Sequence, residues 1–168
     1  MSLSLKQSRE IYDFKPILAG FVSDFGYVYW PAILEWCRLL ASPDDRLFWQ
    51  VWLVIENDSV IGICGLYSLA DGADELWLGW FGILPQLRNS GRGSEALKLI
   101  ESEAVKRGCK TLRTYVDKEG KPIPFYVRHG FVRISSVGEF CNQTGRGLEH
   151  FESSDDHVME KHLQIESE

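Results

Sequence analysis

The chain has 168 residues and a net charge of −6, with 25% charged and 45% hydrophobic residues. This length and composition predict one domain, residues 1–168, with enough apolar residues for a buried core. The acidic balance argues against nucleic acid as a partner, because nucleic-acid-binding domains usually carry a basic face. Because no apolar stretch reaches the length of a membrane span and the first residues lack a signal-peptide pattern, we expect a cytoplasmic protein without a membrane partner.

The spacing of the cysteines and histidines in the sequence does not match that of a metal site or a disulfide framework. The cysteines form no C-x-x-C pair, and the histidines also lack the spacing of metal ligands. We therefore expect no metal site and four reduced cysteines, as is usual in the cytoplasm. These cysteines are Cys37, Cys64, Cys109 and Cys141.

The first predicted elements are a strand, a helix and a hairpin. Residues 9–14 are predicted to form a short strand, and residues 31–40 have apolar side chains at helical spacing. A β-hairpin is predicted next, with strands at residues 47–56 and 60–69 that are joined by a tight polar turn at residues 57–58.

The middle of the chain alternates strands and helices. Residues 76–84 are apolar on both faces, which is typical of a central strand. Residues 94–107 form the clearest helix, because their apolar side chains share one face and a glycine follows. Residues 111–116 are predicted to be a strand, and residues 121–129 a short helix that starts at Pro122.

Two strands, at residues 131–140 and 157–163, are predicted to close the fold. The segment between them, residues 141–156, is expected to be a loop. The order of strands and helices predicts a mixed α/β (α+β) domain built on one sheet.

The strongest functional signal is a glycine-rich segment between the strand at residues 76–84 and the helix at residues 94–107. A glycine-rich turn that opens a helix presents free backbone N–H groups, and the helix dipole adds partial positive charge there. No acidic residue occurs between Glu75 and Glu95. The segment is therefore predicted to bind an anion, and phosphate is the anion that we expect. Its residues are Arg88, Asn89, Ser90, Gly91, Arg92 and Gly93.

Three glycine-rich designs could explain this segment. The Walker pattern is absent from the sequence. Gly91, Gly93 and Ala96 fit the G-x-G-x-x-A pattern of dinucleotide-binding proteins, and Asp117 ends the next strand. In that fold, however, the strand runs almost directly into the first glycine, whereas residues 85–90 intervene here. Too few strand–helix units follow to complete such a sheet.

The third design is Arg/Gln-x-x-Gly-x-Gly/Ala, which residues 88–93 fit at every position. Here the chain resembles the GCN5-related N-acetyltransferases (the GNAT family), whose pyrophosphate loop has this pattern. Residues 83–85 lie where that family has an apolar pair and a proline. Residues 122–131 resemble the family's A-I-x-x-Y-x-x-x-G-F segment, and residues 156–163 are similar to its final strand. The resemblance extends over nearly the whole chain from Leu47 onward.

The resemblance implies a single, mostly antiparallel mixed sheet flanked by helices, the acyl-CoA N-acyltransferase (GNAT) fold. It implies an N-acetyltransferase that moves an acetyl group from acetyl-CoA to a primary amine of a small molecule or peptide. The amine would attack directly in a ternary complex, without a metal. A non-catalytic acyl-CoA-binding domain on the same fold is the alternative. Homodimers are frequent among proteins with this pattern, and the chain is compatible with one.

The resemblance also assigns the residues that bind the co-substrate. Backbone N–H groups from Asn89 to Ser94 would hold the pyrophosphate, with Arg88 and Arg92 adding charge. Backbone groups of Phe81, Gly82 and Ile83 would pair with the pantetheine arm. Two positions depart from the family pattern: Glu119 stands where Asn is common, and Pro122 where Ala is common. The glutamate puts one contact to the arm in doubt.

The catalytic roles follow from the same resemblance. Tyr126 would be the general acid that protonates the CoA thiolate. Glu75 is the first choice for the general base, with Asp74 and water as alternatives. Side-chain alternation places Glu75 on one face of its strand together with Trp77, Gly79 and Phe81. The aromatic residues between positions 21 and 36, and the acidic segment at residues 141–156, are candidates for the acceptor site.

Overall fold

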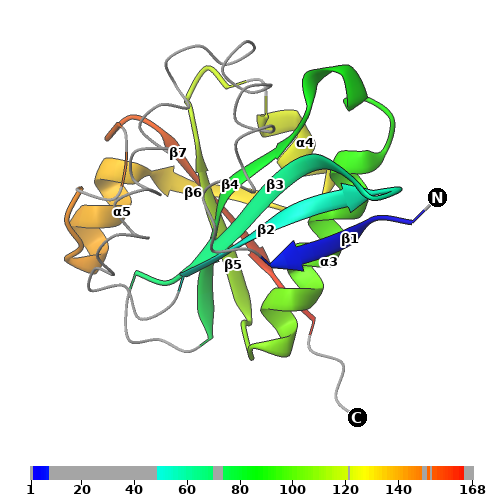
Figure 1. Cartoon of the computed structure of the whole chain (residues 1–168). Helices are drawn as coiled ribbons and strands as arrows, with labels where there is room; N and C mark the ends of the chain where they lie inside the picture. Colours follow the sequence, from blue (N-terminus) through cyan, green and yellow to red (C-terminus); the bar gives the residue numbers. More distant parts are fainter. Residues whose placement is uncertain are drawn as a thin grey trace, which may run out of the picture.

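The apolar runs of the sequence form a seven-stranded sheet in the computed structural model, which describes residues 2–7, 49–69, 74–120, 122–148, 151 and 153–164. The strand order is β1-β2-β3-β4-β5-β7-β6, and only β4 and β5 run parallel. Figure 1 shows this sheet crossing the molecule. The strands are β1 (Ser4–Gln7), β2 (Trp49–Glu56), β3 (Ser59–Tyr67), β4 (Glu75–Ile83), β5 (Thr111–Val116), β6 (Val132–Ser136) and β7 (His157–His162).

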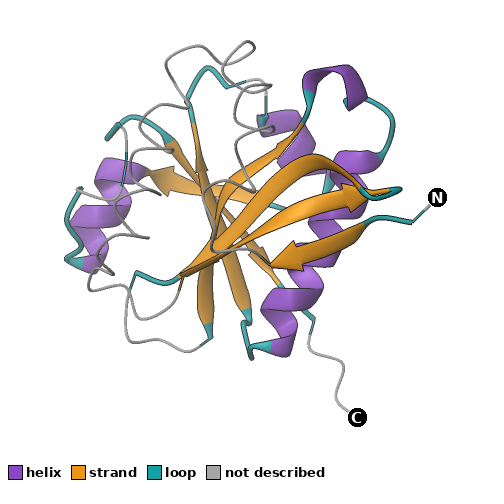
Figure 2. Ribbon diagram, viewed as in Figure 1, coloured by secondary structure: helices purple, strands orange, loops and turns teal. Residues whose placement is uncertain are grey.

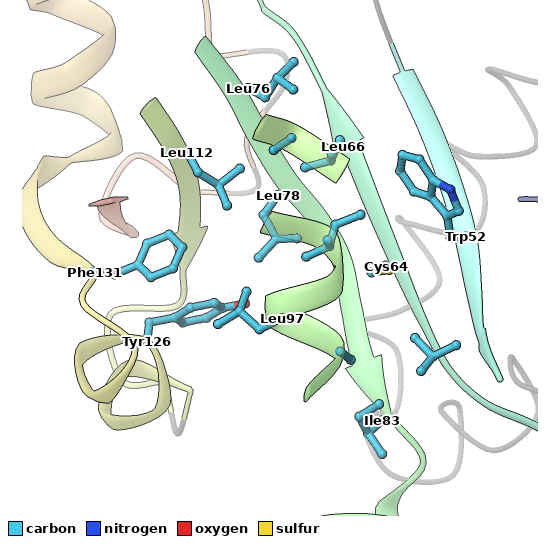
Figure 3. Packing of buried hydrophobic residues seen from close by; sticks show 14 of the residues in the cluster. Trp52, Cys64, Leu66, Leu76, Leu78, Ile83, Leu97, Leu112, Tyr126 and Phe131 are labelled. Carbon is cyan, nitrogen blue, oxygen red and sulfur yellow. The ribbon is translucent and has the colours of Figure 1, made fainter. Parts of the chain in front are cut away.

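Helices cover both faces of the sheet (Figure 2). Helices α3 and α4 contribute to the larger apolar cluster on one face, part of which Figure 3 shows, and α5 packs into a second cluster on the other face. The fold class predicted from the sequence, a mixed and mostly antiparallel sheet flanked by helices, is confirmed. The helices are η2 (Pro85–Leu87), α3 (Arg92–Lys106), α4 (Ile123–Arg128) and α5 (Val137–Thr144).

The hairpin and the central strand are also confirmed. Strands β2 and β3 pair in register around Asn57 and Asp58, whose φ angles of 48° and 62° suit a two-residue hairpin turn. Strand β4 occupies the middle of the strand order, which explains why its sequence is apolar on both faces. In α3, Leu97, Ile100 and Ala104 are fully buried, as the helical spacing predicts.

The predicted strand at residues 131–140 is wrong in its second half. Strand β6 ends at Ser136, and α5 begins at Val137. Ser136 and Glu139 form a capping box, in which the Ser136 hydroxyl accepts the Glu139 amide at 3.2 Å and the Glu139 carboxylate accepts the Ser136 amide at 2.9 Å. This S-x-x-E pattern is a recognisable helix start that the apolar run obscured. The predicted loop at residues 141–156 therefore begins inside a helix.

Some predictions concern segments that the structure does not describe. The strand predicted at residues 9–14, the helix predicted at residues 31–40 and the aromatic residues between positions 21 and 36 lie outside the described residues. Within the described part of the chain, no helix is both long and apolar enough to cross a membrane.

Candidate active site

Strands β4 and β5 are paired along only part of their length. Their register runs from Glu75 opposite Thr111 to Trp77 opposite Arg113, although β4 continues to Ile83. Beyond this point the two strands diverge (Figure 1). Because β3 still pairs with the other edge of β4, the second half of β4 keeps one strand partner. Its edge toward β5 has no such partner among the described strands.

A bulge interrupts β4 within this half. Gly79 lies opposite Gly65 and Gly82 opposite Ile63, so that Trp80 and Phe81 together face one residue of β3. Trp80 has a φ of 50°, which is strained for a bulky side chain. A Cβ atom at Gly65 would lie only 2.5 Å from the Trp80 ring. The glycine therefore leaves the space that this strained conformation needs.

The bulge corrects the predicted alternation of side chains along β4. Trp77 belongs to the cluster under α5, where its ring lies 5.4 Å from that of Phe140. Phe81 instead packs against the cluster under α3 and α4 and stacks on Phe125 at 5.9 Å. The prediction that Trp77 and Phe81 share a face is wrong, because the extra residue in the bulge reverses the alternation.

The glycine-rich segment links the end of β4 to α3. Gly91 is the N-cap of α3 with a φ of 85°, and Asn89 also has a positive φ of 58°. The first hydrogen bond of the helix runs from the Glu95 amide to the Gly91 carbonyl at 3.1 Å. The amides of Arg92, Gly93 and Ser94 precede that bond and lie at the positive end of the helix dipole. This is the geometry of an anion-binding helix N-terminus.

The two arginines of this segment are held by other parts of the chain. Arg88 Nε donates to the Ile83 carbonyl at 2.9 Å, at the end of β4. Arg92 forms an ion pair with Glu56, with its Nη2 at 2.8 Å from Oε2. The guanidinium of Arg92 thus already faces a carboxylate.

Tyr126 lies on α4 and is only 6% exposed. Its ring contacts those of Phe125 and Phe131, both with centroids 5.3 Å away. Figure 3 shows its hydroxyl end directed toward Leu97 of α3. The side chain therefore lies on the same face of the sheet as Phe81.

Phe125 connects the parts of the site that the sequence predicted separately. Its ring stacks on Phe81 of β4, and a Cβ atom at Gly93 would lie 3.4 Å from it. Its neighbour in sequence is Tyr126. The structure therefore brings together the start of α3, the second half of β4 and Tyr126. Neither Phe125 nor the bulge at Trp80 was predicted, because an apolar residue in an apolar run carries no signal of its own.

The carboxylates considered as bases lie at the other end of β4. Glu75 is eight positions before Ile83, roughly 26 Å along an extended strand. Its Oε1 accepts hydrogen bonds from Arg113 and from Arg146, the latter at 2.9 Å. Desolvation raises the pKa of Glu75, but the hydrogen bonds from the two arginines outweigh it, so that the pKa lies below the ordinary 4.5. Asp74 is more exposed, and its carboxylate lies 3.4 Å from Lys110 Nζ.

Comparison with known proteins identifies the family of the chain. A sequence model described as the acetyltransferase (GNAT) family matches residues 14–131, well over half of the chain. The chain belongs to the acetyltransferase (GNAT) family. No curated protein matches the sequence. The GNAT resemblance stated from the sequence is thereby confirmed, and the protein is an acetyltransferase of this family.

Solved structures of other GNAT proteins share the fold. The chain is similar to a GNAT acetyltransferase from Staphylococcus aureus, with 16% identity, a TM-score of 0.68 and coverage of 97% of this chain and 100% of that one. It is also similar to the PaiA N-acetyltransferase from Thermoplasma acidophilum in complex with coenzyme A, with 18% identity, a TM-score of 0.65 and coverage of 97% and 100%. A GNAT acetyltransferase from Elizabethkingia anophelis with acetyl-CoA bound has 18% identity, a TM-score of 0.56 and coverage of 68% and 76%.

The sheet topology distinguishes the dinucleotide-binding pattern from the GNAT pyrophosphate-loop pattern. A dinucleotide-binding domain has a mostly parallel sheet, whereas β4 and β5 are the one parallel pair among the strands that the structure describes. The dinucleotide hypothesis is therefore wrong, although Gly91, Gly93 and Ala96 match its pattern. In this structure Gly91 caps α3 and Gly93 lies in its first turn, in the segment that follows β4.

Proposed function

We propose that this protein transfers the acetyl group of acetyl-CoA to a primary amine of a small molecule or peptide, by direct attack in a ternary complex. The observation that carries the proposal is that the start of α3, with its free amides, lies close to the half of β4 whose edge toward β5 is beyond the last register pair. A diphosphate bound at the start of α3 would lie next to the backbone N–H and C=O groups on the edge of β4. These groups suit the amides of a pantetheine arm. Acetyl-CoA supplies the acetyl group as an activated thioester.

The residues of the loop and of β4 fit this co-substrate. The amides of Arg92, Gly93 and Ser94 precede the first hydrogen bond of α3 and suit a diphosphate. Asn89, Ser90 and Gly91 complete the loop, which we propose binds the same group.

Backbone groups in the second half of β4 form the other part of the proposed binding site. On their edge toward β5, Phe81, Gly82 and Ile83 lie beyond the last register pair of the two strands. Apart from the Ile83 carbonyl, which accepts a hydrogen bond from Arg88 Nε, their backbone groups can therefore pair with a bound chain as a neighbouring strand would. Such pairing would orient the thioester for attack.

Tyr126 is the proposed general acid. As the C–N bond forms and the C–S bond breaks, the departing thiolate accepts the phenolic proton, and Tyr126 is reprotonated from solvent. Its burial on the face that carries Phe81 supports this role. A positioned acid of this kind is typically worth about 10²–10⁴-fold in rate.

The acceptor amine must lose a proton before or during attack. Glu75 and Asp74 are the candidates from the sequence. Glu75 is held by two arginines that lower its pKa, which makes it a weak proton acceptor. Both carboxylates lie at the opposite end of β4 from the loop. Of the three alternatives, we therefore propose that water accepts the proton.

Two measurements test the proposed function. Isothermal titration should show saturable binding of acetyl-CoA and CoA but not of NAD or NADP. With a panel of amines, including polyamines, amino acids and peptides, release of free thiol from acetyl-CoA should accelerate with at least one class. Saturable binding without acceleration by any amine would instead favour a non-catalytic acyl-CoA-binding domain.

A further inference from the structure

Glu56 forms a bidentate ion pair with Arg92 of the glycine-rich loop. It is the last residue of β2, far from the loop in sequence, and its carboxylate meets the guanidinium of Arg92. Arg92 Nε lies 3.1 Å from Oε1 and 2.9 Å from Oε2, and Nη2 lies 2.8 Å from Oε2. The side chains are 11% and 23% exposed, so that the pair is shielded from most solvent.

The remaining nitrogen of Arg92 extends the contact into the loop. Nη1 donates to the Ser90 hydroxyl at 2.8 Å, and that hydroxyl donates to the Leu87 carbonyl at 2.5 Å. A continuous chain of hydrogen bonds thus runs from the end of β2 through Arg92 to both sides of the loop. Arg92 and Ser90 are the donors in this chain, and Glu56 and the Leu87 carbonyl accept at its two ends.

The geometry of Arg92 also determines where its charge acts. Its Nε and Nη2 face Glu56, and its Nη1 faces Ser90. Because the positive charge is balanced by a carboxylate, the main attraction for an anion would come from the backbone amides at the start of α3. The side chain therefore fixes the shape of the loop more than it adds charge to it.

We propose that Glu56 is a positioning residue for the diphosphate-binding loop and acts through Arg92. The proposal rests on the proposed function, because it takes CoA as the ligand. A loop that is already held in its binding shape loses less conformational freedom when the ligand binds. Glu56 itself does not contact the ligand. Its effect is confined to ligands that carry the diphosphate.

The test compares CoA with pantetheine, which lacks the diphosphate. In Glu56→Gln, titration calorimetry should show CoA affinity about three- to tenfold weaker than in the parent, as expected for loss of a charged hydrogen bond. Any measurable affinity for pantetheine should not change. Glu101→Gln is the matched control, because Glu101 also lies in a partly buried pair, 2.6 Å from Lys161. This variant should bind CoA as the parent does.

An Arg92→Lys variant separates positioning from charge. Lysine keeps the positive charge but cannot reproduce the bidentate contact with Glu56. If Arg92 acts through its ion pair with Glu56, Arg92→Lys should weaken CoA binding about as much as Glu56→Gln. If Arg92 instead binds phosphate directly, Arg92→Lys should keep most of the affinity, and Glu56→Gln should bind CoA more tightly because it frees the guanidinium.

The possible failures are distinguishable. A parent protein that does not bind CoA would overturn the proposed function and this inference with it. A parent that binds CoA, with unchanged or tighter binding in Glu56→Gln, would overturn the positioning role alone. Equal losses of CoA and pantetheine affinity would also overturn it, because they would indicate a general structural defect.

Discussion

Trp77 and Arg113 form the last register pair between β4 and β5. On one side of this pair the two strands are hydrogen-bonded to each other, and Arg113 forms ion pairs with Glu75 of β4 and Glu160 of β7. On the other side β4 continues past its bulge to the glycine-rich loop. One strand thus has an ion-paired end that is bonded to β5 and an end whose edge toward β5 is open, which is where we propose that the pantetheine arm pairs with its backbone.

Replacing Tyr126 with Phe removes only the hydroxyl. Because the phenyl ring preserves the contacts with Phe125 and Phe131, the fold and the affinity for acetyl-CoA should be nearly unchanged. Turnover should fall by about 10²–10⁴-fold, the usual contribution of a positioned acid. Steady-state kinetics and titration calorimetry measure the two effects. Tyr67→Phe serves as a control for the loss of a buried tyrosine hydroxyl on the other face. Normal turnover in Tyr126→Phe would exclude the acid role.

Gly91 is required for its backbone conformation and not for space. Its φ is 85°, and a Cβ atom there would meet nothing within 4 Å. Gly91→Ala should therefore lower the free energy of unfolding by roughly 1–2 kcal/mol. Because the loop would be displaced, we also expect CoA affinity to fall about tenfold or more. Both quantities follow from thermal unfolding and calorimetry.

Gly108 provides the matched control for Gly91. It also has a positive φ, 79°, with open space around it, but it lies beyond the other end of α3. Gly108→Ala should lose similar stability and keep its affinity for CoA. If both variants kept normal affinity, the loop would not have the role that we assign to it.

Glu75 should stabilise the fold in a pH-dependent way. Its folded-state pKa is lowered, so the stabilisation is present above its unfolded-state pKa, near 4.5, and is lost as the pH falls through the folded-state pKa. At pH 7, Glu75→Gln should be less stable than the parent by about 1–2 kcal/mol. Denaturant unfolding between pH 7 and pH 3 should show this difference narrowing below pH 4.5. A constant difference would mean that the ion pairs with Arg113 and Arg146 contribute nothing.

The same variant tests the assignment of the base. With water as the proton acceptor, Glu75→Gln should have the pH–rate profile of the parent once its stability is taken into account. Loss of an acidic limb from that profile would restore Glu75 as the general base.

The effects of substitutions at Gly65 and Trp80 on the free energy of unfolding should be coupled. A methyl group at position 65 would overlap the Trp80 ring at 2.5 Å, so Gly65→Ala should destabilise the protein by about 1–3 kcal/mol. Adding Trp80→Ala removes the overlap, and the double variant should be less destabilised than the sum of the two single variants. Denaturant unfolding of the four proteins gives the coupling. Strict additivity would show that the bulge does not depend on this contact.

The local patterns of the sequence were enough for most of the described fold. Helical spacing in α3, the polar turn at Asn57 and Asp58, and the apolar run of β4 each identify one element. The second half of residues 131–140 was assigned wrongly, because Val137 and Phe140 suit a strand as well as a helix. The helix begins there because Ser136 caps its first turn together with Glu139.

The site was only partly predictable, for physical reasons. The proposed binding by the backbone at Gly91 and Gly93 depends on the local conformation of the chain, and glycine in the sequence indicates such a conformation. The bulge at Trp80 depends on pairing with β3, and the Glu56–Arg92 ion pair depends on the tertiary fold. Neither leaves a local signal. The ion pairs of Glu75 with Arg113 and Arg146 likewise join residues that are far apart in the sequence.

The most direct test is amine-dependent release of free thiol from acetyl-CoA, with the acetylated amine identified by mass spectrometry. The parent protein should release one equivalent of thiol for each acetylated amine, and Tyr126→Phe should do so far more slowly. Saturable binding of acetyl-CoA with no transfer to any amine of the panel would contradict the assignment as an N-acetyltransferase.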